Sequence, residues 1–401
     1  MAVWTLDFHA RIRTLFLCML ASLLLAPQAS AAPNAEYLQA FEFVKQQLER
    51  ISCLVGKGYP DYTEKGKWVI KGPDEWTAGY FPGMLWKVYD QTRQTVWLER
   101  ARRWTEPIAD FRNDERDLNF GLLFKPTFAE GYRLTADKRY RRIALDAAAN
   151  HAKRYMPEGK YLRSWGRLDD PKEQAYIIID SLIDMSLLFW AAQEESNPFL
   201  FEMAQNNSLA ILRATMRDDG SSIQVIELDP QTGRKRRDHH KQAFSVTSCW
   251  SRGQGWGIYA FPEIYRYTKD YRILKAAQKM ADYYVAHLPT DFVPYWDFRA
   301  PDIPTAVRDS SAASLAAAGL WKLAKLVTDP ARQEVYRQTA VKTIDSLTRN
   351  YMAAGEAADN GRILLHGTLH KPGGIGVDES LIFGDYYYLE ALLDLIRDGR
   401  D

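Results

Sequence analysis

Cysteine and net charge are both scarce in this chain of 401 residues. It has three cysteines, and 52 Lys and Arg against 51 Asp and Glu leave a net charge of +1. A chain with so little excess charge of either sign is not expected to bind nucleic acid or a membrane surface. A disulfide between Cys53 and Cys249 is chemically permitted, but the sequence does not show that the two residues meet.

Long apolar runs are missing beyond the first thirty residues. Arg11 and Arg13 precede TLFLCMLASLLLA (14–26), and the small residues ASA (29–31) follow it. This is the pattern of a secretory signal peptide, and the run is shorter than the roughly 20 residues of a membrane span. We therefore predict cleavage of residues 1–31, a periplasmic or secreted mature chain and no membrane span after cleavage. A retained N-terminal anchor is the alternative.

Convincing strand patterns are almost absent. SSIQVIELD (221–229), followed by the turn-like DPQTG, is the one segment with clear strand character. Elsewhere apolar residues recur with the period of an α-helix. Twelve helices are predicted, over residues 34–52, 78–91, 95–110, 119–134, 138–155, 177–195, 198–217, 251–267, 270–287, 309–327, 331–350 and 380–397.

The junctions between these helices resemble one another. YRLTADKRYRRIALDAA (132–148) and YRYTKDYRILKAAQKMA (265–281) share an aromatic residue, a Thr-x-Asp junction and a following amphipathic helix. Recurrence of such a unit indicates stacked helical hairpins, and six of them could close into a double ring. We predict an all-α (α/α)6 toroid with a small β-hairpin near 221–229, as one domain over residues 32–401. An open helical solenoid is the alternative.

Two aspartates interrupt the apolar segment AYIIIDSLIDMSLLFW (175–190), namely Asp180 and Asp184. A buried carboxylate costs several kcal/mol unless it is paired or hydrogen-bonded. Asp117, in ERDLNF, precedes another predicted inner helix. Two carboxylates that face each other in a dry pocket have pKa values pushed apart, so that one holds a proton near neutral pH. Asp180 and Asp117 are therefore the candidate catalytic pair; the alternative is that they are a buried structural acid and a helix cap. Asp184 is expected to be structural.

The segment SCWSRGQGW (248–256) concentrates polar and aromatic residues around Arg252. A planar guanidinium matches a carboxylate, and Trp256 lies one helical turn further on. Arg252 is thus a candidate ligand of an anionic substrate, or a partner of Asp180 or Asp117. His366 and His370 have i, i+4 spacing without a helical sequence or a following carboxylate, so neither a metal nor another cofactor is expected.

Several motifs resemble those of a known family when they are taken in order. WTAGYFPGMLW (76–86), IIIDSLIDMSLLFWA (177–191), KQAFSVTSCWSRGQGW (241–256) and GDYYYLEAL (384–392) resemble segments of the unsaturated glucuronyl hydrolases, glycoside hydrolase family 88. The resemblance covers nearly the whole mature chain and implies an (α/α)6 toroid. It also implies removal of the 4,5-unsaturated uronic acid from the non-reducing end of lyase-generated oligosaccharides, by hydration of the vinyl ether double bond.

The resemblance assigns roles to individual residues. It implies that Asp180 is the general acid and base, which protonates C4 before water adds at C5, and that Asp117 is the second carboxylate. The substrate-binding residues predicted with it are Trp76, Tyr80, Arg116, Trp165, Gln224, His240, Gln242, Arg252, Trp256 and His370.

This chain departs from the family pattern at three places around the substrate. Arg116 and Gln224 stand where histidines are usual, and Ala243 follows Gln242 where glycine is usual. These changes bear on the identity of the substrate more than on the reaction. Together with the basic cluster 234–237, Arg116 favours a sulfated or otherwise anionic unsaturated oligosaccharide.

Three other functions remain open at this stage. One is an unsaturated rhamnogalacturonyl hydrolase acting on pectin fragments by the same chemistry. Another is a non-catalytic carbohydrate-binding toroid, and the third is a polysaccharide lyase on the same fold. The sequence does not predict an oligomeric state.

Overall fold

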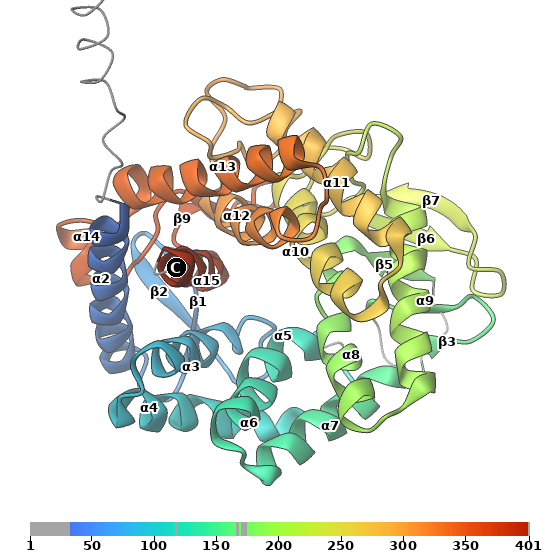
Figure 1. Ribbon diagram of the computed structural model, residues 1–401, viewed down its shortest axis with the longest axis horizontal. Coiled ribbons are helices and arrows are strands. Elements are labelled where there is room, and N and C mark those ends of the chain that lie inside the picture. Colours follow the sequence, from blue (N-terminus) through green and yellow to red (C-terminus); the bar gives the residue numbers. More distant parts are fainter. Residues whose placement is uncertain (1–32, 117–118, 166–167, 170–174, 400–401) are drawn as a thin grey trace, which may run out of the picture.

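The helices of this protein form two concentric rings, as the computed structural model shows (Figure 1). The structure describes residues 33–116, 119–165, 168–169 and 175–399. Along the described chain, outer and inner helices alternate, and each inner helix contacts the next inner helix. The arrangement is the predicted (α/α)6 toroid.

Each helix of the outer ring buries one face against the inner ring. The members of the outer ring are α2 (Pro33–Leu54), α4 (Thr95–Thr105), α7 (Lys138–Ala152), α9 (Pro198–Thr215), α11 (Tyr271–Ala286) and α13 (Pro330–Ser346). The predicted caps are present: Asp137 accepts a hydrogen bond from the Arg139 amide at 2.9 Å, and Asp270 accepts one from the Arg272 amide at 3.0 Å. Each satisfies an amide that the first helical turn leaves without a partner.

The inner ring is buried on nearly all sides. Its members are α3 (Tyr80–Thr92), α5 (Phe120–Phe124) with a π-helical turn (Lys125–Ala129) and α6 (Glu130–Thr135), α8 (Met185–Glu194), α10 (Ser251–Thr268), α12 (Ser310–Ala324) and α15 (Ile382–Asp398). Small residues let these helices approach closely. A Cβ on Gly319 of α12 would lie 2.6 Å from the carbonyl oxygen of Ile258 in α10.

The prediction of a helix over 177–195 is wrong for the residues before Met185. Tyr176–Ile178 is a strand, β5, followed by a 3-10 turn (Ile179–Leu182), and the helix α8 begins only at Met185. A short apolar run with three consecutive isoleucines is equally compatible with a buried strand, and periodicity alone does not separate the two. Pairing with a strand some fifty residues further along decides the outcome.

That partner is β6 (Val225–Leu228), which lies within the predicted strand segment 221–229. It also pairs with β7 (Lys235–His239), so that a three-stranded antiparallel sheet leads into the inner ring.

The expectation of one strand segment is also too low. Three further antiparallel pairs lie among the described residues: β1 (Tyr59–Glu64) with β2 (Lys67–Lys71), β3 (Tyr155–Met156) with β4 (Tyr161–Leu162), and β8 (Gly367–His370) with β9 (Ile375–Glu379).

One buried apolar core extends from Tyr37 to Ile396 and joins the two rings. Within the described residues, every helix is too short or too polar to cross a membrane.

Candidate active site

Asp180 lies where the three-stranded sheet meets the inner ring. The amide of Ile179 donates to the carbonyl oxygen of Gln224 at 3.0 Å, which fixes the residue before Asp180 against the segment that leads into β6. The 3-10 turn then directs the chain into α8. Asp180 is therefore held at the N-terminal end of an inner helix by backbone hydrogen bonds on its N-terminal side.

The environment of Asp180 favours the protonated acid. Its Oδ1 atom is buried, and no hydrogen-bond donor lies near it among the described residues. Burial raises the pKa of Asp180 to about 7, against the opposing attraction of Arg252, while repulsion from Asp184 adds to the rise. A carboxyl group with such a pKa can donate a proton at neutral pH and take it back.

Asp184 ties two inner helices together. Its Oδ1 accepts a hydrogen bond from the Gly121 amide at 2.8 Å, and Nδ2 of Asn119 lies 3.4 Å from its Oδ2. Burial raises the pKa of Asp184 to about 6, and the hydrogen bonds from Gly121 and Asn119 oppose this rise. A Cβ at Gly121 would lie 2.3 Å from the Asp184 Cα, so only glycine permits this approach. The expected structural role of Asp184 agrees with these contacts.

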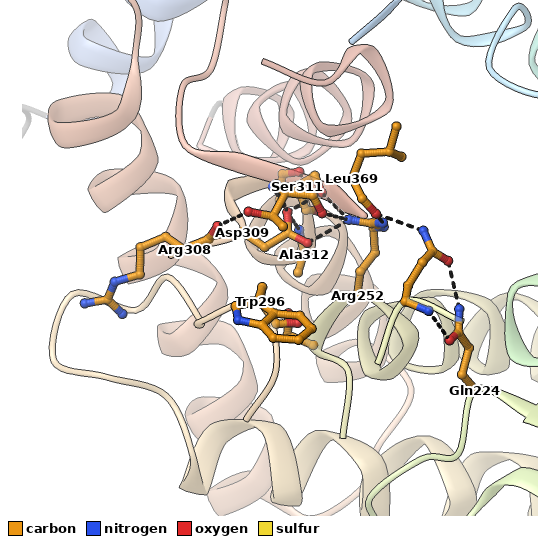
Figure 2. Close-up of polar contacts among 12 residues, drawn as sticks. Gln224, Arg252, Trp296, Arg308, Asp309, Ser311, Ala312 and Leu369 are labelled. Carbon is orange, nitrogen blue, oxygen red and sulfur yellow. Dashed lines mark hydrogen bonds and ion pairs between the residues drawn. The ribbon is translucent and has the colours of Figure 1, made fainter. Parts of the chain in front are cut away.

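Arg252, at the start of α10, is buried and heavily bonded (Figure 2). Its Nη1 lies 2.8 Å from Oδ2 of Asp309, with the two side chains 1% and 0% exposed. The same guanidinium donates to the carbonyl oxygens of Thr368 and Leu369, both at 2.5 Å. It also lies over the ring of Trp250, 4.5 Å from the centroid. The partner of Arg252 is thus Asp309 rather than Asp180, which was one of the two expected partners.

Gln224 and Gln242 continue this network (Figure 2). Oε1 of Gln224 accepts from the amides of Lys241, Gln242 and Ala243 at 2.8, 2.7 and 3.3 Å, and its Nε2 donates to Oε1 of Gln242 at 2.8 Å. Nε2 of Gln242 in turn donates to Leu369, whose carbonyl Arg252 also binds. Gln224 is 3% exposed, so its amide group fixes the turn at 241–243.

Tyr80 of α3 belongs to a cluster of aromatic side chains that come from the loop before α3 and from α10 and α15. Trp76 lies edge-on to Tyr80 and 5.3 Å from Phe383. The Tyr80 hydroxyl lies 3.5 Å from that of Tyr387, which also meets Trp256 edge-on. Tyr80 is close enough to Asp180 for the charge of that carboxylate to raise the tyrosine pKa, although burial is the larger cause.

Trp165 and Lys241 form a second group beside the acid. The Trp165 ring stacks on Tyr176 of β5, at 5.6 Å and 19° between planes, and Nζ of Lys241 lies 4.6 Å from the Trp165 centroid. Burial, with help from Arg252 and Lys241, lowers the pKa of His370, whose Nδ1 accepts from the Gly373 amide. His240 is exposed, with Nδ1 3.0 Å from the Ala243 carbonyl.

The remaining predicted residues do not join this cluster directly. Arg116 is exposed and pairs with Asp114 at 2.7 Å and with Asp74 at 3.2 Å. In the basic cluster 234–237, Arg236 pairs with Asp229, and Lys235 pairs with Asp238. Asp117 lies outside the described residues.

The described residues contain no group of three or more His, Cys, Asp or Glu side chains suited to a metal ion. Cys53 is exposed and Cys249 is buried, and both are free thiols.

A large cavity of about 600 Å³ opens at the other end of the inner ring. Its outer part is lined by the C-terminal halves of α3, α10, α12 and α15, and it extends inward to Tyr80, Leu182 and Tyr387. Asp180, Arg252 and Asp309 themselves lie at or just before helix N-termini. Lys87 and Lys322 meet Glu390 across this cavity, at 2.6 and 2.7 Å. These ion pairs join three inner helices on the side away from the candidate acid.

The geometry agrees with a match between this chain and a protein family. The model of Glycosyl Hydrolase Family 88 matches residues 56–393. The chain belongs to Glycosyl Hydrolase Family 88. It is accordingly a glycoside hydrolase, as the sequence motifs indicated.

Relatives in this family cover almost the same length. An unsaturated chondroitin disaccharide hydrolase of Streptococcus pneumoniae is 33% identical over 365 residues, which are 90% of this chain and 92% of the relative. An unsaturated glucuronyl hydrolase of Bacillus sp. (strain GL1) is 34% identical over 350 residues, 85% of this chain and 92% of the relative.

A solved structure of a variant unsaturated glucuronyl hydrolase from Streptococcus agalactiae, complexed with dGlcA-GalNAc6S, superposes with a TM-score of 0.80. It is 28% identical and covers 92% of this chain and 94% of the other.

Sequence reasoning missed three members of the cluster. Asp309 lies in RDSSA at the start of a predicted helix, and Phe383 lies inside a run of apolar residues; neither position indicates a contact with Arg252. Lys241 stood next to two histidines in HHKQ, and its proximity to Trp165 depends on β5, which was predicted as helix.

Proposed function

We propose that this family 88 enzyme removes the 4,5-unsaturated uronic acid from the non-reducing end of lyase-generated oligosaccharides. The observation that carries the proposal is Asp180, a carboxyl group with a pKa raised to about 7 at the mouth of an aromatic-lined ring. An acid that is substantially protonated at neutral pH suits proton transfer to carbon, for which an ordinary carboxylate at pH 7 holds no proton.

The reaction follows from that group. Asp180 gives its proton to C4 of the vinyl ether, and positive charge develops at C5 and the ring oxygen. The Asp180 carboxylate then takes a proton from a water molecule that adds at C5. The resulting hemiketal opens, and the bond to the next sugar breaks as the leaving oxygen takes up a proton. Asp117 is assigned an electrostatic role on the cation-like transition state.

Trp76 and Trp165 are assigned to the sugar faces, and Tyr80 and Trp256 to the wall behind them. Trp76 and Trp165 are only partly buried, so each presents ring surface to a ligand, while Tyr80 and Trp256 are buried. Arg252 and Gln242 are assigned to the polar edge of the site, where they already share the Leu369 carbonyl.

Sulfated disaccharides are the favoured substrates. The S. agalactiae relative was solved with dGlcA-GalNAc6S, and the S. pneumoniae relative is described as acting on unsaturated chondroitin disaccharide. The ion pairs of Arg116 and Arg236 with neighbouring carboxylates reduce the charge these cations offer a sulfate. Equal turnover of sulfated and unsulfated disaccharides would remove the sulfate preference without touching the reaction.

The decisive assay follows ultraviolet absorbance of lyase-generated disaccharides mixed with the mature protein. The conjugated double bond absorbs, and hydration destroys it, so absorbance falls if the proposal is right. A rise on intact polymer identifies a lyase instead. Oligosaccharide binding without any change in absorbance identifies a binding module. Preference for pectin-derived disaccharides identifies the rhamnogalacturonyl type.

We also propose that residues 1–31 are removed during export and that residues 32–401 form one catalytic domain in the periplasm or outside the cell. The support is the charged, apolar and small-residue pattern of the first 31 residues. The mass of the exported protein tests this: a chain beginning at Ala32 is expected, and the full mass in a membrane fraction contradicts it.

A further inference from the structure

The buried arginine of the site is poorly placed to supply net positive charge to a substrate. Arg252 is 1% exposed, and the Asp309 carboxylate at 2.8 Å neutralises it. Two of its N–H groups are directed at the Thr368 and Leu369 carbonyls. An ion pair that is already closed attracts a second carboxylate weakly, because the two charges of the pair largely cancel at a distance.

Among the residues that the structure describes, Lys241 is a cation without an ion-pair partner on the same side of the ring. Its side chain is exposed, and no carboxylate lies within ion-pair distance of its Nζ among the described residues. Both Asp180 and His370 feel its charge, since Lys241 lowers the pKa of each. It therefore lies near both the candidate acid and the loop that carries His370, with its Nζ over the Trp165 ring.

The backbone of Lys241 is fixed relative to Asp180 by a single residue. The Gln224 carbonyl accepts from the amide of Ile179, the neighbour of Asp180, at 3.0 Å. The Gln224 side chain accepts from the amide of Lys241 at 2.8 Å. Two hydrogen bonds to one buried glutamine thus set the spacing between the acid and the lysine. The Trp165 ring, which stacks on Tyr176, packs against the Lys241 side chain.

We propose that Lys241 binds the carboxylate of the unsaturated uronic acid and that Gln224 is a positioning residue that holds Lys241 beside Asp180. This rests on the proposed function. The carboxylate is attached to C5, next to the C4 that Asp180 protonates, so a cation beside the acid is where this group must lie.

A cycle of two substrates and two proteins tests the contact directly. The substrates are an unsaturated uronyl disaccharide and its methyl ester, in which the carboxyl group is uncharged. The proteins are the mature wild type and Lys241→Met, with Lys241→Arg to restore the charge. Lys275→Met is the matched control, because Lys275 also lies over an aromatic ring, 5.1 Å from the centroid of Tyr271, but on the outer helix α11.

The wild type is expected to prefer the acid over the ester by about 10–100-fold in kcat/KM, the value of one charge-assisted hydrogen bond. Lys241→Met is expected to lose that factor on the acid alone, mainly through KM, so that its preference falls close to one. Lys241→Arg keeps most of the preference, and Lys275→Met keeps all of it. Gln224→Met is expected to weaken the preference, because the turn that carries Lys241 loses its side-chain acceptor.

An unchanged preference for the acid in Lys241→Met overturns the assignment, and so does loss of activity by the same factor on both substrates. Failure of the wild type to consume either substrate is a different result, because it removes the proposed function itself. The circular dichroism and melting temperature of each variant establish that the comparison is between folded proteins.

Discussion

Arg252 and Asp309 form an ion pair between two inner helices, with Nη1 and Oδ2 2.8 Å apart and both side chains excluded from water. Asp309 also caps α12, since its Oδ1 accepts from the Ser311 and Ala312 amides at 3.1 and 3.3 Å. One carboxylate therefore neutralises a buried cation and begins a helix.

Asp309→Asn separates these two tasks. Asparagine is a good helix cap, so the substitution keeps that role and removes only the charge. Removing one partner of a buried pair typically costs about 3–5 kcal/mol, because the other charge is left uncompensated. We expect a loss of this order in urea unfolding. Asp329→Asn is the control, because Asp329 caps α13 from an exposed position; it is expected to change stability by less than about 1 kcal/mol. Equal effects of the two substitutions would contradict the account.

Asp180 predicts the pH dependence of activity. The groups that face it are Arg252, Lys241, Asp184 and Tyr80, and burial outweighs their charges to give a pKa of about 7. The donor form is therefore present below pH 7 and lost above it. The alkaline limb of kcat/KM is expected near pH 7, and Asp180→Asn is expected to lower the rate by about 10²–10⁴-fold. A limb that stays near pH 7 in residual Asp180→Asn activity would assign it to another group.

The raised pKa of Asp180 also predicts how the stability of the fold changes with pH. A carboxyl whose pKa is higher in the folded state than in the unfolded state binds protons more tightly when folded, so it makes folding less favourable as pH rises. Asp180→Asn is therefore expected to melt at a higher temperature than the wild type at pH 8, with a smaller difference at pH 5. A difference independent of pH would mean that the folded pKa is ordinary.

Glu390 predicts the opposite dependence of stability on pH. It accepts from Lys87, Lys322 and the Tyr259 hydroxyl at 2.6, 2.7 and 2.7 Å, and the two lysines hold its pKa far below the usual range although burial opposes them. Its contribution is present above the ordinary glutamate pKa and lost as pH falls below it. Glu390→Gln is expected to lower the urea midpoint at pH 7 and to approach the wild type at low pH.

The control for Glu390 is an exposed pair. Glu334 meets Arg337 at 2.7 Å on the outer helix α13, where water and salt screen the ion pair and leave it little effect on stability. Glu334→Gln should scarcely move the midpoint at either pH. If both glutamines behave alike, the ion pairs around the cavity do not stabilise the ring.

The two thiols differ in reactivity. Burial raises the pKa of Cys249 to about 12, whereas Cys53 is exposed. Only the thiolate reacts with alkylating agents. The folded mature protein is expected to take up one label quickly, at Cys53, and a second only in denaturant. Absence of fast labelling, with recovery of both thiols after reduction, would reveal a disulfide between them.

The sequence predicted those parts of the fold that depend on local signals. Asp137 and Asp270 cap their helices as the Thr-x-Asp junctions indicated, because a cap bonds to amides only two residues away. The part of 177–195 before Met185 was predicted wrongly, because Ile177 pairs with Ile226, and no local pattern reports such a distant partner.

For the site, too, the sequence indicated single residues that have a local signal but not their distant partners. Asp180 stood out because an acid in an apolar run is costly wherever it lies, and Arg252 because of its aromatic neighbours. Neither observation gave the partner of Arg252, since Asp309 is 57 residues away on another helix. Lys241 and Gln224 likewise meet only after β6 has paired with both of its neighbours.

The last helix, α15, lies inside the ring and contacts α12 on one side and α2 and α3 from the beginning of the chain on the other (Figure 1). The toroid is therefore a circle whose first and last segments are neighbours, and its final closing member is residues 382–398. A growing chain has no complete barrel to fold into until these residues have been synthesised. Loss of the C-terminal twenty residues would open the whole wall of the enzyme rather than shorten one end.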